Sequence, residues 1–284
     1  MTYFGFLLRF VILPSLVLLA IAWWEERQGK PLNGFRNGRA VWMAIGIHVL
    51  LAILYTTPWD NYLVATRVWY YNPELVTGLV IGYVPIEEYT FFVVETILAG
   101  LWWWFLARRV SSPAGAFKPS RPMSYLCSCI VICLWLVFTY LFFAGDQKWN
   151  YLSLILIWAL PAILPQFIFG ADILWHHRKF VFWAIFIPGT YLSLMDIVAL
   201  TDTTWSISST QTMGILLFDI LPLEEVVFFF ITNSLITFGM TLLLANVSQR
   251  GFVKFKEQVQ AWRERGISGN KKSVAQAHSS RTGN

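Results

Sequence analysis

Long apolar runs separated by short polar stretches dominate this chain of 284 residues. A membrane-spanning helix needs roughly 20 predominantly apolar residues, because the hydrocarbon core of a bilayer is about 30 Å thick. Seven runs reach about this length, so the pattern predicts an all-α integral membrane protein of about seven transmembrane helices. The predicted helices cover residues 2–24, 40–57, 77–106, 123–144, 150–170, 179–200 and 213–245.

The composition agrees with lipid as the main solvent of the chain. Only 13% of the residues are charged and 57% are hydrophobic, whereas soluble domains have about 25% charged and about 45–50% apolar residues. The net charge of +5 does not indicate a nucleic-acid partner, because the basic residues lie in short loops and in the tail rather than on one face. The lipid bilayer is the expected surrounding.

The basic residues divide unevenly between the two sides of the predicted bundle. When the loops are assigned to alternate sides, 18 of the 21 Lys and Arg residues share one side with the C-terminal tail, and only Arg67 and Lys148 lie on the other. Positive residues mark the cytoplasmic side, so the N-terminus is predicted outside the cell membrane and the C-terminus in the cytoplasm. In the tail, residues 252–265 have the pattern of an interfacial helix, and residues 268–284 lack the apolar residues needed to fold.

Several features recur in the same order in two parts of the chain. A Pro-x-Glu-Glu motif occurs twice, and each copy follows an Asp and, nine residues after it, a Trp; the Trp-to-Pro spacing is 16 residues in the first copy and 17 in the second. A Phe-Phe pair follows each motif. This register predicts an internal duplication. The matched residues are Asp60, Trp69, Pro85, Glu87, Glu88, Phe91 and Phe92 in the first copy, and Asp196, Trp205, Pro222, Glu224, Glu225, Phe228 and Phe229 in the second.

The duplication predicts a division of the chain into two three-helix repeats. The first covers residues 1–106, a loop and connector helix cover 107–149, the second repeat covers 150–245, and a basic, partly disordered cytoplasmic tail covers 246–284. Three helices plus one connector make an even number, so both repeats enter the membrane from the same side and are predicted to be parallel. Both motifs should therefore lie at one depth and face each other across one cavity.

The paired glutamates are the strongest candidates for chemistry. Each motif is predicted to begin about ten residues into its helix, roughly 15 Å from the outer end at 1.5 Å per residue, and its proline should kink that helix. A charged residue at the centre of a membrane helix costs about 2.5–3.5 kcal/mol, which favours function over an acid cluster that merely holds the repeats together. Neighbouring helix residues point about 100° apart, so one Glu of each pair should face the cavity. The candidate catalytic residues are Glu87, Glu88, Glu224 and Glu225.

A neutral Glu beside an ionised Glu would provide a general acid and a general base in one dry cavity. The neighbouring aromatic side chains either stabilise a cation or only pack in the helix. The two aspartates either cap helices or support the glutamates. His48 and Glu95 have no counterpart in the other repeat and are weaker candidates. No metal ion and no cofactor are expected, and the supporting residues are Pro85, Pro222, Asp60, Asn61, Asp196, Phe91, Phe92, Phe228 and Phe229.

Two stretches carry a family resemblance. The first runs Thr57-Pro58-Trp59-Asp60-Asn61-Tyr62 and then Gly82-Tyr83-Val84-Pro85-Ile86-Glu87-Glu88-Tyr89; the second is Leu221-Pro222-Leu223-Glu224-Glu225 with Phe228-Phe229-Phe230 and Thr232-Asn233. Together they resemble the flavin-independent lycopene cyclases, which are membrane cyclases of bacteria and archaea and the N-terminal domain of fungal cyclase–phytoene synthase proteins. The second half departs from the family signature, with Leu194-Met195-Asp196-Ile197-Val198 in place of Pro-Trp-Asp-Asn-Tyr.

The resemblance implies a lycopene β-cyclase that converts linear ends of lycopene into β-ionone rings with no net redox change. It also implies a membrane-dissolved linear carotenoid as substrate and other enzymes of carotenoid synthesis as candidate partners. A membrane terpene or meroterpenoid cyclase, a cyclase of C50 carotenoids and a proton-coupled transporter are the alternatives. The ring type, the number of ends cyclised, the oligomeric state and the division of labour among the glutamates stay open.

Overall fold

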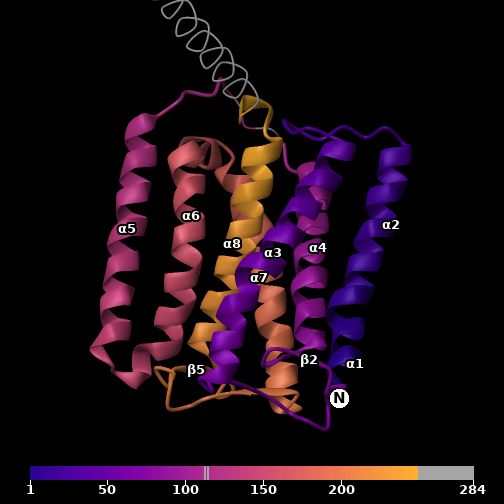
Figure 1. The fold of residues 1–284 in the computed structure, drawn as a ribbon. Helices are drawn as coiled ribbons and strands as arrows, with labels where there is room; N and C mark the ends of the chain where they lie inside the picture. Colours follow the sequence, from indigo (N-terminus) through magenta and orange to yellow (C-terminus); the bar gives the residue numbers. More distant parts are fainter. Residues whose placement is uncertain (112, 114, 249–284) are drawn as a thin grey trace, which may run out of the picture.

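The computed structural model describes residues 1–111, 113 and 115–248, which form a bundle of long helices (Figure 1). Seven helices in this part of the chain are long and apolar enough to cross a membrane, which confirms the all-α membrane class. The segments predicted at 252–265 and 268–284 lie outside the described residues. The helices are α1 (Tyr3–Leu7), the π-helical η1 (Leu8–Ile12), α2 (Leu13–Arg27), α3 (Arg39–Ala65), α4 (Ile86–Ala107), α5 (Arg121–Ala144), the 3-10 helix η2 (Gln147–Trp149), α6 (Asn150–His176), α7 (Arg178–Thr201) and α8 (Leu223–Leu244).

The two motif helices begin later than the sequence pattern predicts. Residues 77–85 and 213–222 are loops with short strands, and α4 and α8 start directly after the two prolines. The residue before a proline is driven out of the helical region, and Gly78 and Gly82 have positive φ angles of 78° and 69°. A helix therefore cannot continue upstream through this segment.

The late helix start overturns two expectations about the motifs. Pro85 and Pro222 are N-cap residues with extended backbones, at ψ 151° and 140°, so they do not kink a helix. The glutamates lie in the first helical turn rather than about ten residues deep. A helix N-terminus favours negative charge, so the penalty for a charge at the centre of a membrane helix does not apply to them.

Short strands at this end of the bundle form hairpins and join the two halves. Strand β1 pairs with β4 in an antiparallel register that places Trp69 opposite Ile207 and Tyr71 opposite Trp205. The turn of the first hairpin has two residues, between β2 and β3, and the turn of the second has three, between β5 and β6. The extra residue explains why the Trp-to-Pro spacing is one longer in the second half. The strands are β1 (Trp69–Tyr71), β2 (Val80–Ile81), β3 (Val84–Pro85), β4 (Trp205–Ile207), β5 (Leu216–Leu217) and β6 (Leu221–Pro222).

The helices α4 and α8 form the centre of the bundle and pack against each other. Helix α2 packs on α4 as α6 packs on α8, and the pair α3–α4 corresponds to α7–α8; α3 also contacts α8, and α7 contacts α4. The internal duplication stays a prediction from the sequence, and this matched packing supports it. Helix α5 lies at one edge of the bundle (Figure 1) and exposes large side chains such as Tyr140 and Phe143, as expected for a surface that faces lipid.

Candidate active site

A pocket lies at the end of the bundle where α4 and α8 begin. It holds about 330 Å³ of space that no atom fills, part of which is open to the surroundings. Three carboxyl side chains line it, those of Glu88, Asp196 and Glu225, and among the described residues no Lys, Arg or His does. The other lining residues are aromatic: Tyr3, Trp69, Tyr71, Phe91, Trp205, Phe228 and Phe229.

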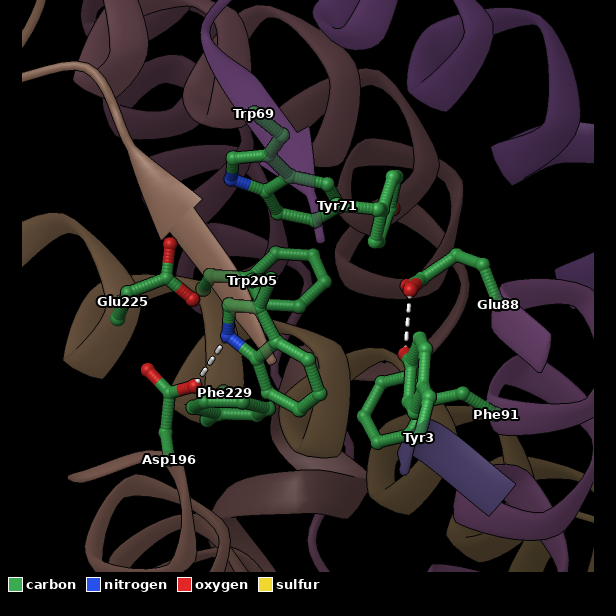
Figure 2. A pocket seen from close by; sticks show the side chains of 10 residues that line it. Tyr3, Trp69, Tyr71, Glu88, Phe91, Asp196, Trp205, Glu225 and Phe229 are labelled. Atoms are coloured by element: carbon green, nitrogen blue, oxygen red, sulfur yellow. Dashed lines mark hydrogen bonds between the residues drawn. The ribbon is translucent and has the colours of Figure 1, made fainter. Parts of the chain in front are cut away.

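One glutamate of each motif faces this pocket, and each meets a tyrosine from the start of a different helix. Tyr3 of α1 donates its hydroxyl proton to Glu88, and Tyr151 of α6 donates to Glu225. All four side chains are buried. Figure 2 shows Glu88 with Tyr3 on one side of the pocket and Glu225 on the other. The two candidate acid–base groups are therefore held by neutral donors around one space.

The other glutamate of each motif binds the loop that precedes its helix. Glu87 accepts a hydrogen bond of 2.6 Å from the backbone N–H of Thr77, and Glu224 accepts one of 2.7 Å from Met213. Both are buried but do not line the pocket. The four glutamates thus divide into a pocket-facing pair and a loop-binding pair, as the angle between neighbouring helix residues indicates.

The two aspartates occupy matched positions but differ in their contacts. Asp196 lines the pocket, and its Oδ1 accepts a hydrogen bond of 2.8 Å from the indole N–H of Trp205, while its Oδ2 is buried without a partner among the described residues. Asp60 is fully buried and outside the pocket lining, and neither of its oxygens has a partner in the described part of the chain. Neither aspartate caps a helix, since Asp60 lies within α3 and Asp196 within α7.

Aromatic rings form most of the pocket wall. Phe91, Phe228 and Phe229 line it, whereas Phe92 is buried nearby against Tyr89 and does not. Aromatic faces attract cations by about 0.5–2 kcal/mol each, and the rings also keep water out. Burial raises the pKa of Tyr71 in β1 well above its ordinary value, and the nearby carboxyl groups of Asp60 and Glu88 raise it further. Tyr71 is therefore a neutral phenol at physiological pH.

Asn61 has a structural task beside the pocket. Its Oδ1 accepts a hydrogen bond of 2.8 Å from the N–H of Tyr83, and its amide N–H₂ group donates to the carbonyl of Thr57 and the hydroxyl of Tyr89. A Cβ atom at Gly82 would approach Asn61 Oδ1 to 2.1 Å, and the positive φ of Gly82 also disfavours other residues. Asn61 therefore fixes the β2–β3 hairpin.

The two unmatched candidates lie outside the pocket lining. Glu95 is buried on α4 and accepts a hydrogen bond of 3.2 Å from Thr232, which occupies the corresponding position of α8. His48 is buried, its Nδ1 lies 2.7 Å from the Ala44 carbonyl oxygen, and its ring packs against Gly239. In the described part of the chain, neither side chain hydrogen-bonds to Glu88 or Glu225, so both are set apart from the candidate chemistry.

Sequence reasoning missed the tyrosines and did not give the tryptophans a role in the site. Trp69 and Trp205 are in register with the repeats, which could have marked them as site residues. The tyrosines carry a weaker signal, because each only stands at the start of the first helix of its repeat. Tyr71 has no signal of this kind, since Ile207 is the residue at the corresponding position of β4.

Known proteins similar to this chain are carotenoid enzymes. The lycopene beta-cyclase of Halobacterium salinarum strain R1 is 37% identical over 207 residues, which is 72% of this chain and 83% of the relative. This coverage of both proteins decides the assignment. The chain belongs to the lycopene cyclase family.

Fungal relatives of this lycopene cyclase family member match it over part of their length. The bifunctional lycopene cyclase/phytoene synthase of Gibberella fujikuroi is 33% identical over 196 residues, which is 68% of this chain and 33% of the fungal protein. The corresponding protein of Phaeosphaeria nodorum is 36% identical over 203 residues, 67% of this chain and 34% of its own. No family model and no solved structure matches the chain.

Proposed function

We propose that this family member is a lycopene β-cyclase, which converts a linear end of lycopene into a β-ionone ring without net redox change. The observation that carries the proposal is that Glu88 and Glu225, one from each motif, line a single aromatic pocket. The names of the archaeal and fungal relatives support lycopene as the substrate. An acid cluster with only a structural task would not need an open space between its members.

The reaction needs one proton delivered and one proton removed. An acid adds a proton to C2 of the terminal C1=C2 double bond, which leaves a cation at C1. The C5=C6 double bond attacks that cation, so a bond forms between C1 and C6 and the positive charge moves to C5. A base then removes the proton from C6, which restores a C5=C6 double bond inside the ring. Two carboxyl groups of opposite protonation state on one pocket can perform both transfers.

The pocket walls suit the cationic intermediates of this reaction. The rings of Trp69, Trp205 and Phe228 line the space, and aromatic rings stabilise positive charge through their π-faces. Because most of the lining area is apolar, the walls offer few partners to a water molecule that could trap the cation as an alcohol. The atom-free space is too small for the whole of a long polyene, so most of the substrate chain must extend out of the pocket toward lipid.

We infer that the pocket lies near the outer surface of the membrane. The basic residues of the loops gather at the opposite end of the bundle, and positive loops mark the cytoplasmic side. The N-terminus, at the pocket end (Figure 1), is then outside and the C-terminus inside. A carotenoid that lies across the bilayer would place one end near this depth.

Expression in a bacterium that accumulates lycopene tests the proposed function. The expected result is conversion of red lycopene into a product whose chromatogram and absorption spectrum match β-carotene. Unchanged lycopene beside a folded, membrane-inserted protein would overturn the proposal. Monocyclic, ε-ring or C50 products in matched hosts would keep a carotenoid cyclase and change its substrate or ring type. Cyclised meroterpenoids without any carotenoid product would favour the terpene cyclase alternative.

A further inference from the structure

The two halves of the pocket differ in how their tyrosine hydroxyls are bound. The hydroxyl oxygen of Tyr151 accepts a hydrogen bond of 2.9 Å from the indole N–H of Trp69, and the same hydroxyl donates to Glu225. In the other half, the matching indole N–H of Trp205 donates its hydrogen bond to Asp196. The hydroxyl oxygen of Tyr3, which donates to Glu88, therefore accepts no hydrogen bond from a tryptophan.

This difference fixes the direction of one hydroxyl proton. A tryptophan indole can only donate, so the oxygen of Tyr151 must accept from Trp69, and its single proton is left for Glu225. If Glu225 kept a proton on that oxygen and donated it instead, the buried hydroxyl proton of Tyr151 would have no acceptor among the described residues. Such an unpaired buried group costs about 1–3 kcal/mol. A proton on the other carboxyl oxygen of Glu225 would avoid this cost, but the donation from Trp69 polarises the Tyr151 hydroxyl and strengthens its hydrogen bond to Glu225. A hydrogen bond to a carboxylate favours its charged form, so the Trp69–Tyr151 chain favours the ionised form of Glu225.

On the Glu88 side two phenols, Tyr3 and Tyr71, lie beside the carboxyl group, and in the described part of the chain neither hydroxyl accepts a hydrogen bond that would fix its direction. The hydroxyl of Tyr3 can donate to one oxygen of Glu88 while the other oxygen carries a proton, or it can rotate and accept that proton itself. The Glu88–Tyr3 pair is therefore compatible with both protonation states. Figure 2 shows Glu88 across the pocket from Asp196 and Glu225, whose oxygens accept from Trp205 and Tyr151. Because like charges around one space oppose ionisation of every member, an ionised Glu225 favours a proton on Glu88.

We propose that the asymmetric tryptophan contacts divide the labour between the repeats: Trp69 and Tyr151 position Glu225 as the base, and Glu88 beside Tyr3 is the acid. This inference rests on the proposed cyclase function. In each turnover Glu88 gives its proton to C2 of the substrate and Glu225 takes the proton from C6. One proton enters and one leaves, so the pocket must return a proton from Glu225 to Glu88 before the next cycle.

The proposal predicts different isotope patterns for acid-side and base-side variants. Membranes that contain the enzyme are incubated with unlabelled lycopene in heavy water, and product and recovered substrate are analysed by mass spectrometry. In the wild type, each new ring carries one deuterium at C2. Glu225→Gln still protonates the substrate but cannot complete the ring, so the cation returns to lycopene and leaves deuterium at C2. Glu88→Gln cannot start the reaction, so its recovered lycopene is unlabelled.

The positioning residues are tested by the ratio of labelled lycopene to product. Trp69→Phe and Tyr151→Phe should raise this ratio at least threefold over the wild type, because the acid step persists while the base step slows. The matched controls Trp205→Phe and Tyr3→Phe should not raise it. A variant that only misfolds lowers label and product together and leaves the ratio unchanged, and such a result for Trp69→Phe and Tyr151→Phe would count against the proposal.

The outcomes separate this inference from the proposed function. If the wild type forms no rings, the cyclase function fails. If the wild type forms labelled rings but Glu225→Gln leaves unlabelled lycopene, the division of labour is wrong while the function stands. Labelled lycopene from Glu88→Gln would also overturn the division, because another group would then deliver the proton. Labelled ε- or γ-ring products from Glu225→Gln would support it, since they need the acid step and a different base.

Discussion

Buried carboxyl groups lie at both ends of the bundle, and their partners differ. At the end away from the pocket, Glu25 lies 2.8 Å from the guanidinium of Arg109, 3.5 Å from that of Arg108 and 3.4 Å from the ammonium of Lys30. At the pocket end, Glu88 and Glu225 have tyrosine hydroxyls as partners and no ion pair among the described residues. Charge is neutralised at one end and left uncompensated at the other.

The contrast separates structural from chemical acids. Cationic partners keep Glu25 ionised and tie α2 to the loop after α4, and a carboxylate held in this way is a poor proton donor. The pocket carboxyls have only neutral donors, which allow either protonation state. The second oxygen of Asp196 and both oxygens of Asp60 are buried without partners in the described part of the chain. Such groups cost stability. Because Oε2 of Glu87 and of Glu224 is also buried without a partner among the described residues, an unpartnered oxygen does not by itself mark a chemical acid.

The largest expected effect comes from removing the pocket carboxyls. Glu88→Gln and Glu225→Gln should each lower the rate of product formation at least about 100-fold, because a positioned general acid or base contributes roughly 10²–10⁴ to rate. Pigment per amount of folded protein, with folding judged by gel filtration in detergent, measures this loss. Each variant should be at least as stable as the wild type. Rates within threefold of the wild type for both would return the pocket acids to a structural task.

The opposite result is expected for the acid at the other end. Glu25→Gln leaves the guanidinium of Arg108, whose side chain is 2% exposed, without its carboxylate. Removal of one partner of a buried ion pair costs about 3–5 kcal/mol, and we expect about 3 kcal/mol here because Lys30 and Arg109 are partly exposed. Thermal unfolding in detergent measures the loss, and activity per folded protein should be unchanged. Lys30→Gln is the matched control, with an expected change below about 1 kcal/mol.

The loop-binding glutamates allow the two acids of each motif to be compared with each other. Glu87→Ala and Glu224→Ala remove the acceptor for a backbone N–H, so each should cost about 1–3 kcal/mol of stability. Glu87→Gln and Glu224→Gln keep a carbonyl oxygen in that position and should cost less. The glutamine variants should also keep activity within about tenfold of the wild type. A loss as large as that of Glu88→Gln would mean that all four glutamates take part in chemistry.

Much of this site could be predicted from the sequence, because membrane helices and buried charges leave strong local signals. The seven apolar runs gave the helices, and the repeated motif gave the four glutamates. The depth of the motifs was wrong because the apolar residues of 77–85 and 213–222 look helical by hydropathy alone. The glycines at 78 and 82 and the position of Val84 before a proline were the signals for a hairpin.

The remaining part of the site depends on contacts between distant segments. Tyr3 lies 85 residues before Glu88, whereas Tyr151 lies 74 residues before Glu225, so no constant spacing links tyrosine to motif. Trp69 and Trp205 occupy matched positions, yet one binds a tyrosine and the other an aspartate. A repeat alignment predicts identical contacts for both. The asymmetry on which the acid–base division rests is visible only in three dimensions.

The smallest expected effect is on stability at acidic pH, through a histidine at the end of the bundle away from the pocket. Burial, together with the nearby His176, lowers the pKa of His177 to about 4. The unfolded chain therefore takes up a proton near pH 6.5 before the folded protein does, so stability is greatest above this pH and falls between about pH 6.5 and 4. His177→Phe removes the titrating group and can keep the ring contact with Phe35, which lies 4.8 Å away between centroids.

The variant should therefore lose less stability on acidification. We expect the fall in unfolding free energy between pH 7 and pH 4.5 to shrink by roughly 1–2 kcal/mol, less than the full shift because solvent partly screens the ring. Thermal unfolding in detergent across this pH range measures it, with His176→Phe as the control that keeps the buried titrating group. An unchanged fall would assign the acid sensitivity to another group. A larger fall would mean that protonated His177 stabilises the fold, which is the opposite of the expected effect.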